Sequence, residues 1–112
     1  MSQFALIYRQ GELKLSPEEM QRHLSDCQNW FKDLLAKGTI KDIGVPLGSD
    51  RSAVVSNQKV IYDGPFGEVK DVIGGFTLVE TDDLAEAIRV AQTCPVVEVG
   101  GAVEVRPVQG CS

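Results

Sequence analysis

Two segments of the sequence are apolar at successive positions, and this pattern restricts the fold more than any other feature. Residues 4–8 read Phe-Ala-Leu-Ile-Tyr, and residues 72–79 read Val-Ile-Gly-Gly-Phe-Thr-Leu-Val. A strand with one face in water alternates apolar and polar residues, whereas a strand that is apolar at successive positions is covered on both faces. We therefore expect both segments to be strands of a sheet whose two faces are buried.

The clearest helix signal is the run Ser16-Pro17-Glu18-Glu19. Serine is a favoured N-cap, proline fits the first helical position, and a glutamate three residues after the serine completes a capping box. The pattern predicts a helix of about 21 residues that ends at Lys37 and Gly38. The apolar residues at helical spacing within it are Met20, Leu24, Cys27, Phe31, Leu34 and Leu35.

The rest of the chain predicts one more helix and several shorter strands. Gly74 and Gly75 interrupt the strand at 72–79, which indicates a bulge or the close approach of another group. The other predicted elements are strands at 43–47, 53–55, 60–62 and 103–107, the middle two forming a hairpin, and a helix that Asp82 caps and Cys94-Pro95 ends.

The predicted order is strand, helix, two or more strands, helix, strand, which is the split βαβ arrangement of ferredoxin-like α+β domains with an antiparallel sheet. A chain of 112 residues forms a single domain, here residues 1–112. Two helices cover only one face of the sheet, so its other apolar face would be left in water. We therefore expect a homodimer in which two subunits pair sheet to sheet.

Charge and cysteine content exclude several classes of protein. Sixteen acidic against 11 basic residues give a net charge of −5, with no dense basic run, which argues against nucleic acid as a partner. Cys27, Cys94 and Cys111 are too widely spaced for a disulfide framework or a zinc knuckle. No run approaches the ~20 apolar residues of a membrane span, and no signal peptide precedes the first strand, so we expect a cytoplasmic protein without membrane contact.

The sequence also resembles a known family. The motif Asp63-Gly64-Pro65-Phe66 is followed by Glu68-Val69-Lys70 and by Val-Ile-Gly-Gly-Phe at 72–76, and together these are similar to the YCII-related family in its DGPF-domain branch. Further segments that agree are Tyr8, the run at 16–20, the region of Leu47, and residues 99–107.

The resemblance implies a ferredoxin-like subunit that pairs into a dimeric α+β barrel. It implies less about chemistry, because most members of this branch have no established activity and some accompany sigma factors. Related members have been proposed to use a His-Asp pair, and a histidine at the position of His23 is common in the family. One relative dehydrochlorinates an aromatic ring.

His23 and Asp63 are the candidate catalytic pair. His23 is the single histidine, and its spacing from Met20 and Cys27 turns it toward the packed face of its helix. An imidazole exchanges protons near neutral pH, and a carboxylate at the end of the strand 60–62 could orient the ring. The alternatives are a packed helix histidine and an aspartate that caps the next loop. No metal is expected, because His23 and Cys27 lack a third ligand.

A ligand cleft is expected between the first helix and the loop at 64–67. Gly64 and Pro65 suit a tight turn at this loop. Aromatic walls for a small planar ligand would come from Tyr8, Trp30, Phe66 and Phe76, for which core packing is the alternative role.

Two functions therefore compete. The first is a small-molecule enzyme, of lyase or isomerase type, in which His23 exchanges a proton and Asp63 orients it. No cofactor is expected, since no dinucleotide, P-loop or G-x-S-x-G motif is present. The alternative is a non-catalytic dimer module that binds a ligand or a protein, with a regulatory role.

Overall fold

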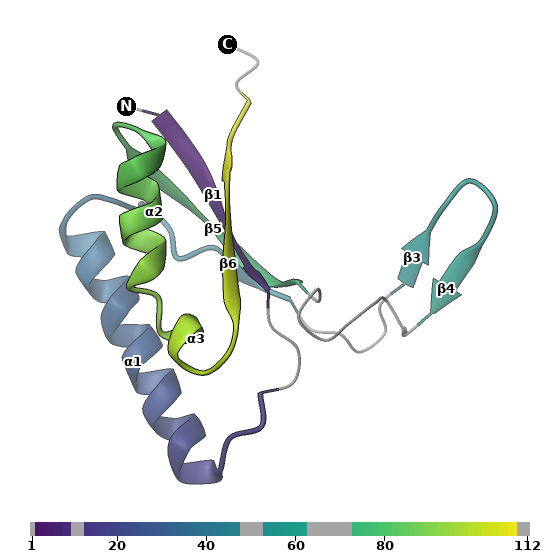
Figure 1. The fold of residues 1–112 in the computed structure, drawn as a ribbon, viewed down its shortest axis with the longest axis horizontal. Coiled ribbons are helices and arrows are strands. Elements are labelled where there is room, and N and C mark those ends of the chain that lie inside the picture. The colour runs from purple at the N-terminus through teal and green to yellow at the C-terminus, as the bar shows by residue number, and fades with distance from the viewer. Residues whose placement is uncertain (1, 10–12, 48–52, 63–72, 110–112) are drawn as a thin grey trace.

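The computed structural model describes residues 2–9, 13–47, 53–62 and 73–109. In these segments a four-stranded antiparallel sheet carries the strands in the order β2-β5-β1-β6, with the helices packed against it (Figure 1). The sheet consists of β1 (Ser2–Arg9), β2 (Val45–Pro46), β5 (Ile73–Thr81) and β6 (Ala102–Pro107), and the helices are α1 (Pro17–Ala36), α2 (Leu84–Gln92) and α3 (Pro95–Glu98).

This strand order confirms the ferredoxin-like α+β prediction. The two central strands, β1 and β5, pair antiparallel from Ser2 opposite Thr81 to Arg9 opposite Ile73. Each helical crossover skips one strand position, so that β2 pairs with β5 and β6 pairs with β1 on the outer edges. A single sheet with its helices on one side follows from these connections.

The predicted capping box starts α1. The Ser16 hydroxyl oxygen accepts the Glu19 backbone N–H at 3.1 Å, and Glu19 Oε1 accepts the Ser16 N–H at 3.0 Å. Both groups would otherwise lack a partner in the first turn of the helix. The predicted apolar stripe is narrower than expected, because Leu24 and Leu35 are exposed while His23 and Leu34 are buried.

The predicted cap of α2 is wrong by one residue. Asp83, and not Asp82, has the extended backbone of an N-cap, and its Oδ1 accepts the Glu86 N–H at 2.9 Å. The backbone N–H of Asp82 instead donates to Glu86 Oε2 at 3.0 Å. After α2 the chain turns at Pro95 into α3, a short helix that the sequence did not predict.

Gly74 and Gly75 allow β2 to approach β5 closely. Tyr8 pairs with Gly75 and Arg9 with Ile73, so Gly74 is an extra residue and forms the predicted bulge. A Cβ at Gly75 would lie 2.7 Å from the carbonyl oxygen of Val45, which leaves no room for a side chain. Gly74 and Gly75 therefore allow β2 to lie close against this end of β5.

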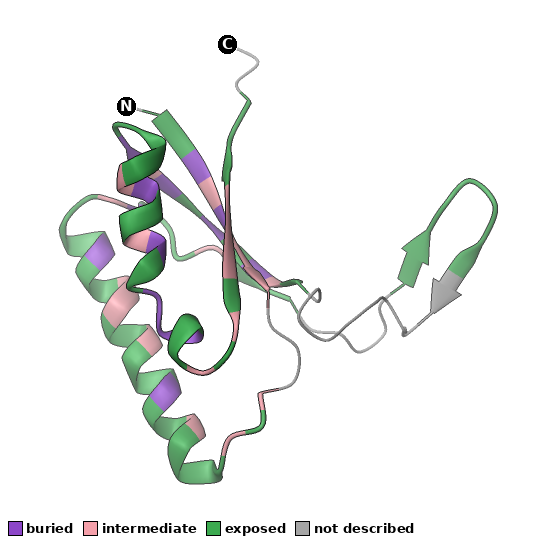
Figure 2. Ribbon diagram, viewed as in Figure 1, coloured by how far each residue is buried: buried purple, intermediate pink, exposed green. Residues whose placement is uncertain are grey.

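The core lies between the helices and one face of the sheet (Figure 2). Its buried members are Phe4, Leu6, Leu34, Ile40, Val79, Ala87 and Ala91. Alternation along β5 sends Phe76 and Leu78 to the other face, where they are 41% and 42% exposed. The second face of the sheet is therefore not covered by the described helices.

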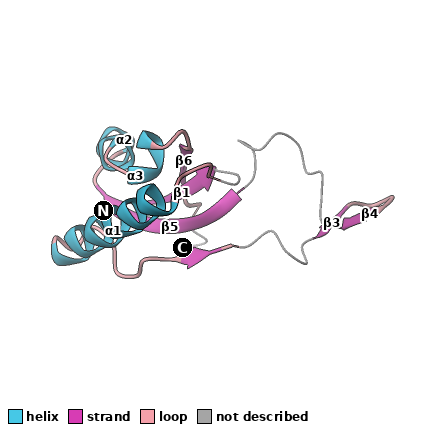
Figure 3. Cartoon of the chain, turned by 90° about the horizontal axis from the view of Figure 1, so that it is seen from below, coloured by secondary structure: helices cyan, strands magenta, loops and turns pink. Residues whose placement is uncertain are grey.

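The predicted hairpin forms a separate two-stranded sheet of β3 (Ala53–Val55) and β4 (Val60–Tyr62). It stands away from the four-stranded sheet in both views (Figures 1 and 3). Of the helices in the described segments, none is both long enough and apolar enough to cross a bilayer.

Candidate functional site

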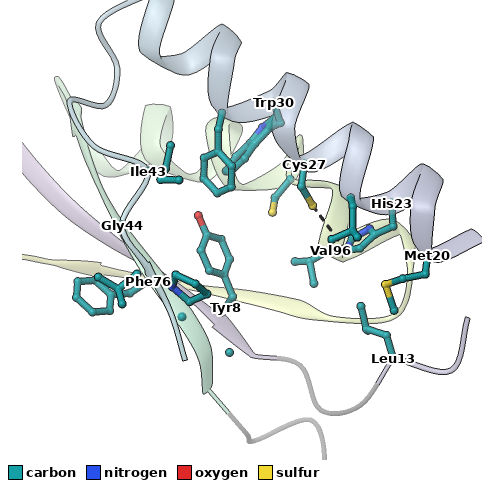
Figure 4. A pocket seen from close by; sticks show the side chains of 17 residues that line it. Tyr8, Leu13, Met20, His23, Cys27, Trp30, Ile43, Gly44, Phe76 and Val96 are labelled. Carbon is teal, nitrogen blue, oxygen red and sulfur yellow. Dashed lines mark hydrogen bonds between the residues drawn. The ribbon is translucent and has the colours of Figure 1, made fainter. Parts of the chain in front are cut away.

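A pocket of about 420 Å³ lies between α1 and the adjacent end of the sheet (Figure 4). This volume falls within the usual range of small-molecule sites. The pocket is lined by residues of α1, β1, β2, β5, the loop before β2 and the segment around α3: Tyr8, Leu13, Met20, His23, Leu24, Cys27, Trp30, Phe31, Ile43, Gly44, Val45, Pro46, Gly74, Gly75, Phe76, Cys94 and Val96.

One face of α1 supplies the upper wall. His23, Cys27 and Trp30 are three or four residues apart, so they project from the same side of the helix toward the sheet (Figure 4). Across the pocket, Tyr8 points up from β1, with its hydroxyl directed toward the helix.

Tyr8 is the start of a hydrogen-bond chain. Its hydroxyl lies 2.6 Å from Thr77 Oγ1, and Thr77 Oγ1 donates to the carbonyl oxygen of Ile43 at 2.7 Å. Thr77 is fully buried on β5, and its acceptor Ile43 belongs to the loop that precedes β2. The chain of bonds therefore ties three separate segments together at the floor of the pocket.

Burial controls the ionisation of Tyr8. Loss of water contact raises the pKa of its phenol above the ordinary value, and the hydrogen bond to Thr77 only partly offsets this effect. Tyr8 is therefore a neutral phenol at physiological pH.

His23 is 7% exposed and lines the pocket. Its Nε2 lies 3.6 Å from the Cys27 sulfur, a weak contact one helical turn away. A sulfur atom at this distance is a weaker hydrogen-bond partner than an oxygen or a nitrogen.

Both described cysteines face this pocket as neutral thiols. Burial raises the pKa of Cys94 to about 11, with a smaller opposing effect of its backbone hydrogen bond to Val96. Burial and the nearby Asp26 carboxylate raise the pKa of Cys27. The two thiols therefore add no negative charge to the site.

Trp30 is held in place from a second helix. Its indole Nε1 donates to Thr93 Oγ1 at 2.8 Å, and Thr93 is the C-cap of α2. The ring also packs edge-on against Phe31, with centroids 5.1 Å apart. This gives the pocket a rigid aromatic wall.

The lining carries no charged side chain among the described residues. Within the same residues, no group of three or more histidine, cysteine, aspartate or glutamate side chains is arranged to hold a metal ion. The polar groups that a ligand can meet are the Tyr8 oxygen, the His23 imidazole, the two thiols and backbone atoms. The site therefore suits a neutral, largely apolar molecule.

Four of the residues predicted from the sequence come together at this pocket. They are Tyr8, His23, Trp30 and Phe76. The alternation of β5 points the Phe76 side chain to the opposite face of the sheet. Phe76 therefore borders the pocket at its place in the strand, and its ring does not form the expected aromatic wall.

The other predicted residues, Asp63, Gly64, Pro65 and Phe66, lie outside the described residues, as does Cys111. The pairing of His23 with Asp63 therefore stays a prediction.

Sequence reasoning missed Thr77 and Gly44. The signal for Thr77 was a lone hydroxyl within the apolar run 76–79, a residue type that needs a partner when it is buried. Gly44 has a positive φ of 88° and its N–H is bound by Asp42 Oδ1 at 2.9 Å, in an Asp-x-Gly turn that the sequence displays at 42–44.

Fold and site together define a small ferredoxin-like α+β domain with a partly open apolar pocket beside its first helix. The YCII-related domain model matches residues 2–111, and the chain belongs to this family. No curated protein matches the chain.

Among solved structures, the chain is similar to the 5-chloro-2-hydroxyhydroquinone dehydrochlorinase of Burkholderia phenoliruptrix AC1100 in complex with 2,5-dihydroxybenzoquinone. The two are 20% identical, with a TM-score of 0.48, over 95% of this chain and 93% of the other.

Proposed function

We propose that the pocket binds a small ring-shaped molecule and that His23 exchanges a proton with it, without a cofactor. The reaction class is isomerisation or elimination at a carbon next to a carbonyl or on a phenol. Within the family, we assign the chain to the DGPF branch on the motif Asp63-Gly64-Pro65-Phe66.

The observation that carries this proposal is the weak partnering of a buried imidazole. Three polar side chains are buried among the described residues: His23, Thr77 and Thr81. Thr77 donates to Ile43 O at 2.7 Å and Thr81 to Asp83 O at 3.1 Å, whereas the His23 contact is to sulfur at 3.6 Å. A buried polar group normally has a strong partner, so a ligand atom is the natural one for His23.

The proton transfer needs only the imidazole and the ligand. A ring nitrogen of His23 takes a proton from the carbon beside the carbonyl, and the electron pair moves onto the oxygen as an enolate. The imidazolium formed in the same step balances the charge of the enolate. The same nitrogen returns the proton to another atom, which gives isomerisation. In elimination the leaving group departs from the enolate as an anion, and the imidazolium passes the proton to water. Asp63 would act as the orienting acid by accepting the other imidazole N–H.

Proton exchange tests this function directly. Purified protein in deuterated water is incubated with 6-hydroxy-1-indanone, a neutral hydroxy-substituted ring ketone with acidic C–H groups, and deuterium uptake is followed by NMR. Chlorohydroquinone, which can lose HCl to give benzoquinone with no other reactant, is tested in parallel by chloride release. We expect protein-dependent turnover in at least one assay, reduced by about 100-fold or more in His23→Gln, because general acid–base groups contribute about this much.

Gln28→Ala is the matched control, since Gln28 is exposed on the same helix, outside the pocket lining. It should retain the wild-type rate. Equal turnover by wild type and His23→Gln would remove the histidine from the mechanism. Asp63→Asn should lower kcat with little effect on ligand binding if Asp63 orients the ring.

A second candidate is a non-catalytic ligand-binding module. The position of His23 on the packed face of α1 favours it, because a buried helix histidine also serves packing alone. In this case ring compounds bind to the wild type without deuterium uptake or chloride release, and His23→Gln binds them nearly as well.

We also propose that the protein is a homodimer joined through the open face of its sheet. Val45, Phe76 and Leu78 are 53%, 41% and 42% exposed there. Register places them together, since Val45 is opposite Phe76 on neighbouring strands. An apolar surface of this kind is normally covered by a partner.

A further inference from the structure

The hydrogen atoms of the Tyr8–Thr77–Ile43 chain can be assigned from its geometry. A threonine hydroxyl has one proton, and the Ile43 carbonyl oxygen can only accept. Thr77 therefore gives its proton to Ile43, at 2.7 Å. The 2.6 Å contact between Thr77 and Tyr8 then requires the Tyr8 proton, because two acceptor oxygens at this distance would repel each other.

The consequence for the pocket is that the Tyr8 hydroxyl cannot donate a hydrogen bond to a ligand. Its proton points to Thr77, and its remaining lone pairs are what the oxygen offers to the pocket. The phenol cannot change this by ionising at physiological pH, since burial raises its pKa. Tyr8 is thus a fixed acceptor in a lining whose described residues include no charged side chain.

We propose that Tyr8 selects ligands that carry a hydrogen-bond donor, and so that the substrate class is a neutral hydroxy- or amino-substituted ring compound. This rests on the proposed function of the pocket. A carbonyl, ether or carboxylate oxygen at the same point would face the lone pairs of Tyr8 and is disfavoured, the carboxylate most strongly because its charge would also be desolvated.

Four ring compounds of similar size test the selection. p-Cresol carries an O–H donor and p-toluidine an N–H donor, whereas 4-methylanisole and p-tolualdehyde carry only acceptors. Binding is followed through the fluorescence of Trp30, the chain's one tryptophan, which lines the pocket. We expect p-cresol to bind about two- to tenfold more tightly than 4-methylanisole, the range of a net hydrogen bond. The p-toluidine arm shows whether N–H serves as well as O–H.

Two variants separate the preference of Tyr8 for ligands with a hydrogen-bond donor, which we call the donor rule, from the effect of general packing. Tyr8→Phe removes the acceptor and keeps the ring, so p-cresol should fall to the affinity of 4-methylanisole, which itself should change little. Thr77→Val frees the Tyr8 proton, so p-tolualdehyde should gain about two- to tenfold. Thr77→Ser keeps the hydroxyl and should retain the wild-type order.

Each outcome has a meaning. Equal binding of p-cresol and 4-methylanisole by the wild type, or an unchanged preference in Tyr8→Phe, would overturn the donor rule while leaving the pocket a ligand site. Failure of all four compounds to bind would overturn the proposed function together with the rule. Circular dichroism checks each fold, and should Thr77→Val not fold, Tyr8→Phe decides alone.

Discussion

The ionisable side chains at the pocket share one environment. Burial is the largest cause of the raised pKa values of Tyr8, Cys27 and Cys94. Each of these groups is neutral when protonated, so the pocket stabilises neutral forms over anions. At the scale of the residue, the site is a low-dielectric space in which hydrogen-bond direction rather than charge discriminates between ligands.

Cys94 gives a pH-dependent contribution to stability. Its pKa is about 11 in the folded protein against 9.0 for an unperturbed thiol. Between these values the unfolded chain loses the proton and the folded chain keeps it, so stability is complete below about pH 9 and falls as pH rises. We expect a loss of about 1 kcal/mol in the free energy of unfolding between about pH 8 and pH 10 from this group.

Urea denaturation at the two pH values measures the effect, with Cys94→Ala as the comparison. The alanine variant is less stable at both pH values, since it leaves a small cavity, but its stability should depend less on pH. An equally steep dependence in wild type and Cys94→Ala would show that the thiol does not ionise on unfolding in this range.

At the scale of the element, local sequence signals predicted local structure well. The Ser16 capping box and the bulge at Gly74 depend on residues within a few positions of each other, so they could be read from the sequence. The sequence could not show whether Asp82 or Asp83 is the N-cap of α2, because two adjacent aspartates followed by Glu86 fit the same local pattern.

The site was predictable only where helical spacing determines it. His23 and Trp30 share a face of α1, which the spacing alone indicates. Thr77 and Tyr8 meet through the pairing of β1 with β5, and Ile43 reaches them from a loop 34 residues before Thr77. These contacts depend on the register and the path of separate segments, which composition and periodicity do not specify.

Gly44 positions the loop that closes the pocket. Its φ is +88°, and a Cβ there would overlap the carbonyl oxygen of Phe76. Gly38 also has a positive φ, of 76°, but no atom of the described residues lies within 4 Å of its Cβ position. We expect Gly38→Ala to cost about 1 to 2 kcal/mol, from the left-handed conformation alone, and Gly44→Ala at least about twice as much.

Thermal or urea denaturation of the two variants measures the difference. Gly44→Ala should also weaken p-cresol binding, because Gly44 lines the pocket, whereas Gly38→Ala should leave binding unchanged. Equal losses of stability in the two variants would mean that β5 and the loop move apart at little cost.

At the scale of the whole molecule, the sheet separates two different surfaces. The helix side contains the core and the pocket, while the opposite side carries apolar residues flanked by ion pairs. Glu104 meets Arg9 at 2.6 Å and Arg106 at 3.6 Å on that side, and Lys41 meets Glu80 at 3.5 Å. An apolar centre with a polar rim is the usual anatomy of a protein interface.

The proposed dimer predicts the effect of a charge at the centre of this surface. Leu78→Glu should convert a dimer to a folded monomer at micromolar concentration, because an unpaired carboxylate would be buried at the contact. Leu84→Glu is the control, since Leu84 is similarly exposed but belongs to α2. Light scattering after size-exclusion chromatography gives the mass. A monomeric wild type, or a dimeric Leu78→Glu, would contradict sheet-to-sheet pairing.

The central claim is that a ligand in the pocket meets the imidazole of His23. Because the chain has one histidine, its ring nitrogens give one set of signals in a long-range ¹H–¹⁵N NMR spectrum, and these can be followed during a titration with p-cresol. The account predicts that the His23 ring signals shift and saturate together with the indole signal of Trp30. Ring signals that stay unchanged while the Trp30 signal moves to saturation would contradict it.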